Sequence, residues 1–240
     1  MTEPPPTSSP PVDDPRGEPP SRRARVTRKP ARARYPRAEV DAILDEALVC
    51  HVALVRDGAP VAIPTLHARI GDHVYVHGST ASPALRALAG GAPACLTATL
   101  LDGIVLARSV AHHSANYRSA VVHGHGEPVT EPEAKLAALE RFTERLAPGR
   151  WAEARPPTEQ ELRGVAVARI ALDEASAKVR EGPPGDDEAD YALPVWAGVV
   201  PVALARGVPI PDPRLAPDVA PSAAVRAIAG ARPPAPAADE

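Results

Sequence analysis

The sequence predicts a mainly β protein, an antiparallel barrel of six or seven strands with helices at its periphery. Two tight-turn dipeptides, Asp57-Gly58 and Gly71-Asp72, separate three successive apolar runs. Such short connections favour antiparallel pairing, because parallel strands need a long crossover. Strand-like and helix-like segments do not alternate through the centre of the chain, which argues against a doubly wound parallel sheet.

Composition divides the 240 residues into three parts. The 31 prolines are concentrated at the two ends, where the chain has too few apolar residues to offset the entropy of ordering. We therefore predict a disordered Pro/Arg-rich tail over 1–33, a folded domain over 34–202 and a disordered Pro/Ala-rich tail over 203–240.

Charge and cysteine content limit the expected partners and compartment. The net charge is -3, and residues 1–37 hold nine Lys/Arg against four Asp/Glu, a local balance of +5. This basic run resembles a solvated arm, so we do not expect nucleic acid as a partner. Cys50 and Cys95 lie in apolar runs, as buried thiols do. No segment has the pattern of a membrane span or signal peptide, so we expect a cytoplasmic protein.

The first half of the domain begins with a helix after Pro36, on which Val40, Ile43, Leu44 and Ala47 share one face. Strands are predicted over 49–56, 59–70 and 73–77. Ser82 is expected to cap a helix that starts at Pro83. Because the loop 78–82 offers backbone N–H groups and serine hydroxyls, it is a candidate anion site.

The second half is predicted to contain a hairpin, two helices and two further strands. The hairpin joins 94–101 to 104–108 through a turn at Asp102-Gly103, and a strand covers 120–129. Capping boxes begin helices at Thr130 and Thr158. A last long strand runs over 165–172.

A polar segment lies between two of these apolar runs. Arg108, His112, His113 and the tripeptide Tyr117-Arg118-Ser119 precede a Val-Val strand directly. Donors at a strand end are held rigidly, which suits anion binding better than solvation does. The alternative for such a segment is a solvated loop.

Other cofactor motifs are absent or incomplete. The chain has no dinucleotide fingerprint, P-loop lysine motif or Gly-x-Ser-x-Gly elbow. His123 and His125 would share one face of a strand, but no histidine follows them to complete a cupin-type set. We expect no metal ion, while a haem ligand among the histidines stays open.

Three segments resemble the pyridoxamine 5′-phosphate oxidase-related flavoproteins, most closely the branch that contains the nitroimidazole-resistance proteins. They are Leu101 to Ser109, His112 to Ser119 and Val121 to Gly124. The resemblance extends over about 34–202. It implies the FMN-binding split-barrel fold, a homodimer and FMN held between the two subunits.

The resemblance also implies which residues bind the cofactor. The strand that runs along the flavin ring would contribute Ile63, Pro64 and Thr65. Two groups would hold the phosphate: His77, Gly78, Ser79 and Ser82 in one, and Tyr117, Arg118 and Ser119 in the other. Relatives often have Lys or Arg where this chain has Pro83 and Ala84, so Arg86 is expected to supply that charge. From the partner subunit, the expected contacts are Lys178, Arg180 and Trp196.

Two functions follow from this interpretation. The first is an FMN-dependent oxidoreductase that acts on a small organic substrate such as a nitro-aromatic compound, with the flavin carrying the redox chemistry. The second is a flavin or haem carrier without turnover. The fold alone does not separate them.

Overall fold

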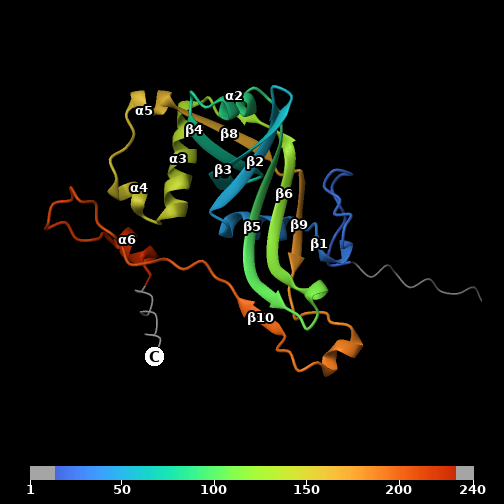
Figure 1. The fold of residues 1–240 in the computed structure, drawn as a ribbon. Coiled ribbons are helices and arrows are strands. Elements are labelled where there is room, and N and C mark those ends of the chain that lie inside the picture. Colours follow the sequence, from blue (N-terminus) through green and yellow to red (C-terminus); the bar gives the residue numbers. More distant parts are fainter. Residues whose placement is uncertain (1–13, 231–240) are drawn as a thin grey trace, which may run out of the picture.

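The computed structural model describes residues 14–230, and the parts of the predicted tails outside this range are not described. Ten strands form one antiparallel sheet, in the order β1-β9-β6-β5-β2-β3-β4-β8-β7, and β10 pairs with β5 (Figure 1). The strands are β1 (Ala33–Arg34), β2 (Val49–Arg56), β3 (Ala59–Ile70), β4 (His73–Ser79), β5 (Pro93–Leu106), β6 (Ser114–His125), β7 (Glu127–Pro128), β8 (Val165–Ala171), β9 (Glu174–Arg180) and β10 (Gly198–Pro201).

Six α-helices and three short 3-10 helices accompany the sheet in the described part of the chain. The α-helices are α1 (Arg37–Glu46), α2 (Pro83–Ala89), α3 (Pro132–Leu146), α4 (Arg150–Glu153), α5 (Glu159–Gly164) and α6 (Ala223–Ile228). The 3-10 helices are η1 (Pro30–Arg32), η2 (Val110–His112) and η3 (Glu188–Ala192). None of the helices among residues 14–230 has the length and apolar character needed to cross a membrane.

The mainly β, antiparallel prediction is confirmed, but the sheet has more strands than the six or seven expected. β9 was missed because its sequence, Glu-Ala-Ser-Ala-Lys-Val-Arg, has too few strand-forming residues to stand out. β1, β7 and β10 have only two to four residues each. Strands this short form only because longer strands far away in the sequence pair with them.

The hairpin predicted at Asp102-Gly103 is wrong. β5 runs through this dipeptide without turning, and its register against β6 shifts between Leu101 and Gly103. This irregularity is a β-bulge. A Cβ atom at Gly103 would lie 2.8 Å from Cγ1 of Val199, so the glycine is needed for the close approach of β10. Asp102-Gly103, a dipeptide typical of turns, therefore lies within a strand here, and its glycine allows β10 to pack closely.

The polar segment was also expected to precede its strand, but much of it lies inside the strand. β6 begins at Ser114, six residues earlier than predicted, and pairs with β5 along its length. Asn116 to Ser119 are therefore strand residues whose side chains alternate between the two faces of the sheet.

The inner face of the sheet encloses the main hydrophobic core. Small and branched side chains from seven strands meet α1 and α2 there, among them Cys50, Leu96, Ala120 and Ile170. β6 and β8 come close where the sheet curls back on itself. A Cβ at Gly124 would lie only 2.6 Å from Cγ2 of Ile170, so that approach requires glycine.

α3 covers the opposite face of β3 and β4 and makes a second, smaller core. Ala138 and Phe142 pack there with Tyr75 and Val167. Figure 1 shows α3, α4 and α5 grouped at this side of the molecule. The capping box at Thr158 is confirmed, whereas α3 begins after Glu131 with no side-chain cap, so the box predicted at Thr130 is wrong.

Both segments predicted as tails contain ordered contacts within the described range. Ala24 is buried, and the backbone N–H of Val26 donates to the Tyr35 hydroxyl at 3.0 Å. In the C-terminal segment, Ser222 caps α6 and hydrogen-bonds Glu153. The exact domain boundaries at residues 33 and 203 stay predictions.

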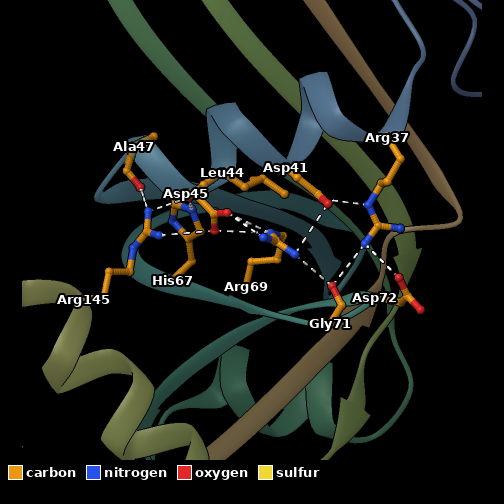
Figure 2. A network of polar contacts seen from close by, with 10 residues as sticks. All are labelled: Arg37, Asp41, Leu44, Asp45, Ala47, His67, Arg69, Gly71, Asp72 and Arg145. Atoms are coloured by element: carbon orange, nitrogen blue, oxygen red, sulfur yellow. Dashed lines mark hydrogen bonds and ion pairs between the residues drawn. The ribbon is translucent and has the colours of Figure 1, made fainter.

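A polar network joins α1 to β3 and α3 (Figure 2). Arg145 on α3 has a side chain only 7% exposed and donates to the carbonyl oxygens of Leu44 and Ala47 at the end of α1. Arg69 on β3 pairs with Asp45 and Asp41. These bonds satisfy carbonyl groups that the helix itself leaves unpaired, and they hold the helix in place over the barrel.

His67 is the fully buried member of this network. Its Nε2 donates to the Leu44 carbonyl oxygen at 2.9 Å. Burial, with the nearby positive charge of Arg145, lowers the pKa of His67 from 6.5 to about 4. The imidazole is thus neutral in the folded protein at neutral pH.

We expect His67 to make the fold sensitive to acid. Between pH 6.5 and 4 the unfolded chain protonates this histidine while the folded form does not. Unfolding then takes up a proton, so the free energy of unfolding falls as the pH falls, by about 3 kcal/mol over the window. Urea unfolding at several pH values should show a shallower acid-side slope for His67→Gln. The exposed His125→Gln should keep the wild-type slope; equal slopes for all three proteins would contradict the assignment.

Candidate functional site

A cavity of about 210 Å³ lies between α2 and the strands β2, β3 and β4. Several predicted cofactor residues share its wall, although they come from separate segments. They are Ile63, Pro64, Thr65, His77, Gly78, Ser79 and Ser82. The remaining lining is apolar, mainly Val52, Leu54, Leu85 and Leu88. The structure therefore brings the 63–65 segment and the 77–82 loop together around one cavity.

Polar groups stand at the loop side of this cavity. The Ser82 hydroxyl caps α2 by accepting from the backbone N–H of Leu85, as predicted. The Ser79 hydroxyl accepts from the backbone N–H of Ala81 at 3.1 Å. Arg86, one helical turn beyond Ser82, does not line the cavity itself; it is exposed and makes no ion pair with the residues that the structure describes. It is thus available to an incoming anion.

His77 borders the cavity but its ring is directed elsewhere. The ring packs edge-on against Phe142 of α3, with centroids 4.2 Å apart. Burial lowers the pKa of His77, and its Nδ1 has no hydrogen-bond partner among residues 14–230. A neutral imidazole packed against α3 suits a structural role better than phosphate binding.

Arg118 does not join the loop residues. Its guanidinium pairs with Asp102 at 2.8 Å and with Glu46 at the end of α1. Both carboxylates raise the pKa of Arg118 above its usual range. Because its charge is already neutralised twice, the structure argues against Arg118 being the main phosphate anchor.

The other predicted residues of this group lie on the outer face of the sheet. Tyr117 pairs with Arg180, and Ser119 pairs with Lys178, across β6 and β9. Directly opposed residues of antiparallel strands project to the same face. Trp196, in the segment before β10, is 65% exposed. One chain therefore places these residues on a different surface from the cavity under α2.

The outer face of β2 continues this surface and is apolar. Val49, His51, Ala53 and Val55 alternate along the strand, and the Val55 side chain is 66% exposed. His51 stands opposite Pro64 on β3 and Thr97 on β5. No hydrogen bond or ion pair involving the His51 ring is found among residues 14–230. The outer face of β2 is therefore an exposed apolar strip that carries the imidazole of His51.

Comparison with known proteins identifies the chain. The family model for pyridoxamine 5′-phosphate oxidase matches residues 36–179. The chain belongs to this family of flavin-binding split barrels. No curated protein sequence matches the chain.

Three solved structures are similar to this oxidase-family chain. It is 42% identical to the flavocytochrome Anf3 from Azotobacter vinelandii, over 88% of this chain and 98% of that one, with a TM-score of 0.83. It is also 42% identical to the FAD and haem binding protein from Mycobacterium smegmatis, over 83% and 98%, with a TM-score of 0.80. A proposed 5-nitroimidazole antibiotic resistance protein from Bacteroides thetaiotaomicron has 20% identity over 61% and 86%, a TM-score of 0.53 and thus the same fold.

The family assignment confirms the resemblance seen in the sequence. It does not by itself choose between FMN and FAD. One group of residues was not predicted from the sequence: Arg28, Lys29 and Arg32, expected to belong to a solvated arm, line a cavity beside Arg180. The strand alternation of Arg32, Ala33 and Arg34 was the available signal, but it is too short to predict pairing.

The geometry predicts that Arg86, rather than Arg118, supports flavin binding. A charge-assisted hydrogen bond contributes roughly 1.5–3 kcal/mol. We therefore expect Arg86→Ala to weaken flavin binding about tenfold to a hundredfold in a fluorescence titration. Arg118→Ala should leave the affinity nearly unchanged and lower the melting temperature, because Glu46 and Asp102 lose their partner. The reverse ranking would restore Arg118 as the anchor.

Proposed function

We propose that this protein is a flavin-dependent redox protein whose flavin lies between two copies of the chain. The observation that carries the proposal is the separation of the predicted cofactor residues. The cavity under α2 holds one group, and the outer face of β6 and β9 holds the other. A second copy would bring the outer face of one chain to the cavity of the other.

The size of the cavity supports a shared site. Pockets that enclose a small organic ligand usually measure about 300–1,000 Å³, whereas this one has about 210 Å³. A single chain therefore encloses only part of a flavin. The exposed apolar side chains Val49, Val55 and Leu101 also favour burial against a partner, and two-fold pairing is the commonest way to cover such a face.

We expect the flavin to be FAD, in place of the FMN suggested by the sequence. The two proteins with 42% identity support this choice, since one is named as an FAD and haem binding protein. The missing dinucleotide fingerprint is no obstacle, because that motif belongs to a different fold.

Haem is proposed as a second cofactor, because both of these relatives are named for it or as a flavocytochrome. Haem iron takes an imidazole nitrogen, and porphyrin needs apolar surroundings. His51 meets both conditions, since it is exposed between Val49 and Ala53 on the apolar outer face of β2. His67 and His77 fit less well, because their rings are packed inside the protein.

The flavin would supply hydride or single-electron transfer. The residues of the chain would supply position and surroundings. Backbone groups of Ile63 to Thr65 lie along one wall, Arg86 offers a positive charge, and a partner subunit covering the outer face would exclude water. This arrangement suits turnover of a small organic oxidant, including a nitro-aromatic compound, in the cytoplasm. A carrier without turnover is the alternative, and a turnover assay with the loaded protein separates the two.

The cofactors can be identified from the purified protein. We expect denaturation to release FAD, recognised by chromatography against FMN, and the native spectrum to contain both flavin bands and a Soret band. His51→Ala should remove the Soret band and keep the flavin, while His125→Ala should retain both. Release of FMN, or a Soret band that survives in His51→Ala, would contradict these assignments.

Trp196 should link assembly to cofactor binding. Its exposed indole lies beside β10, where a partner subunit and its flavin could both contact it. Trp196→Ala is expected to weaken the dimer and the flavin affinity together in sedimentation and titration experiments. The matched control is Trp151→Ala on α4, which should preserve both. A monomeric wild type with full flavin affinity would disprove the shared site.

A further inference from the structure

A second cavity, of about 680 Å³, lies at the end of β9 and away from α2. Three segments line it: the N-terminal stretch around η1, the η2 turn, and the loop after β9. Cationic side chains dominate the lining. Those with a fixed positive charge are Arg28, Lys29, Arg32, Arg34 and Arg180, while Glu181 is the one carboxylate in the lining.

None of these five cations is neutralised within the described chain. The ion pairs among residues 14–230 involve other arginines and His112. Arg34 donates only to the backbone carbonyls of Ala31 and Ala33. Like charges held together repel one another, so a bound anion would relieve this repulsion.

Arg180 is the residue that makes this more than a basic surface. It is 9% exposed, and its hydrogen-bond partners are neutral: it donates to the Asn116 side chain and to the carbonyls of Gly182 and Pro183. Its Nε has no partner among residues 14–230. Burying a guanidinium without a counter-charge is unfavourable. Burial and the charge of nearby Arg32 also lower the pKa of Arg180.

Hydrogen bonds and an ion pair fix the loop after β9, which forms one wall of the cavity. Asp186, with a fully buried side chain, accepts from the backbone N–H of Arg108 at 2.9 Å and pairs with its guanidinium at 3.0 Å. Arg108 in turn stacks on Tyr191. The loop 182–186 is thereby fixed against η2, and the cations face a preformed space. His112 also lines the cavity, and its ring lies close to Asp187 and Asp190, with the ligand atoms of the three residues within 4.8 Å of one another.

We propose that this basic cavity binds the diphosphate group of a dinucleotide. Five fixed cations exceed what a single phosphate needs, and guanidinium groups match phosphate oxygens in bidentate fashion. The volume accommodates a diphosphate together with an adjoining sugar. Arg180 shares the outer sheet face with Tyr117, so a dinucleotide held here could extend toward the proposed flavin site.

Two dinucleotides carry this chemistry: FAD itself, and a nicotinamide dinucleotide that donates electrons. The FAD source rests on the proposed function, whereas binding of free diphosphate does not. The first experiment is therefore calorimetric titration of the flavin-free protein with inorganic pyrophosphate and with ADP. We expect both to bind, and we expect Arg32→Met to weaken them about tenfold to a hundredfold. Arg163→Met, an exposed arginine on α5, is the control and should bind as the wild type does.

A second experiment separates the two sources. If FAD is the ligand, FAD-loaded protein should no longer bind ADP while FMN-loaded protein does, and Arg32→Met should weaken FAD but not FMN. If a nicotinamide dinucleotide is the ligand, FAD-loaded protein should still bind ADP and NADPH, and Arg32→Met should weaken NADPH alone. Arg32 is only partly buried, whereas Arg180 is buried, so the Arg32 variant is expected to fold even where Arg180→Met does not.

Three results would overturn the proposal. The first is no binding of pyrophosphate or ADP by the flavin-free wild type. The second is equal binding of citrate, which would indicate an unspecific anion site. The third is binding of a short single-stranded oligonucleotide in preference to ADP, which would make this surface a nucleic-acid contact. A protein that binds pyrophosphate but no flavin would refute only the proposed function.

Discussion

Pairing of β5 with both β2 and β6 is the interaction on which the rest of the structure depends. One edge of β5 bonds to β2, the other to β6, and beyond the bulge the strand also binds β10. This register sends Leu96 and Ala98 into the core and Thr97 and Leu101 to the outer face. A shift by one residue would exchange the two faces, burying polar groups and exposing the core. The same register therefore determines which residues face the cavity under α2 and which lie on the outer face of the sheet.

That separation explains why the proposed function involves two copies. Within one chain, the barrel wall stands between the loop after β4 and the end of β9. The residues predicted to hold one cofactor thus divide between a small cavity under α2 and an open outer face. The apolar strip with His51 and the basic cavity with Arg180 both adjoin the outer face. Covering this face with a second chain would complete both proposed cofactor environments.

Charge in this protein is used in two different ways. Around α1, Arg69 and Arg145 satisfy carboxylates and helix-terminal carbonyls (Figure 2). Arg118 pairs with Glu46 at the end of the same helix, and these arginines hold the fold together. Around η1 the cations have no such partners within the described chain. The buried Arg145 is stabilised by its contacts within the fold. Arg180 is buried without a carboxylate partner, and a bound anion would stabilise its charge. Contact partners, rather than charge alone, distinguish the two roles.

The sequence by itself determined the antiparallel β class, α1, α2 and α3, and the caps at Ser82 and Thr158. These features depend on local periodicity, on turn and cap chemistry, and on motifs that remain visible along the chain. Tertiary structure alone decided the bulge at Gly103, the short strands and the pairing of Arg118. It also decided the cavity around Arg180, to which Arg32 comes from about 150 residues away along the chain. Those features depend on contacts between residues far apart in the sequence, and a local sequence pattern does not show which distant residues will be in contact.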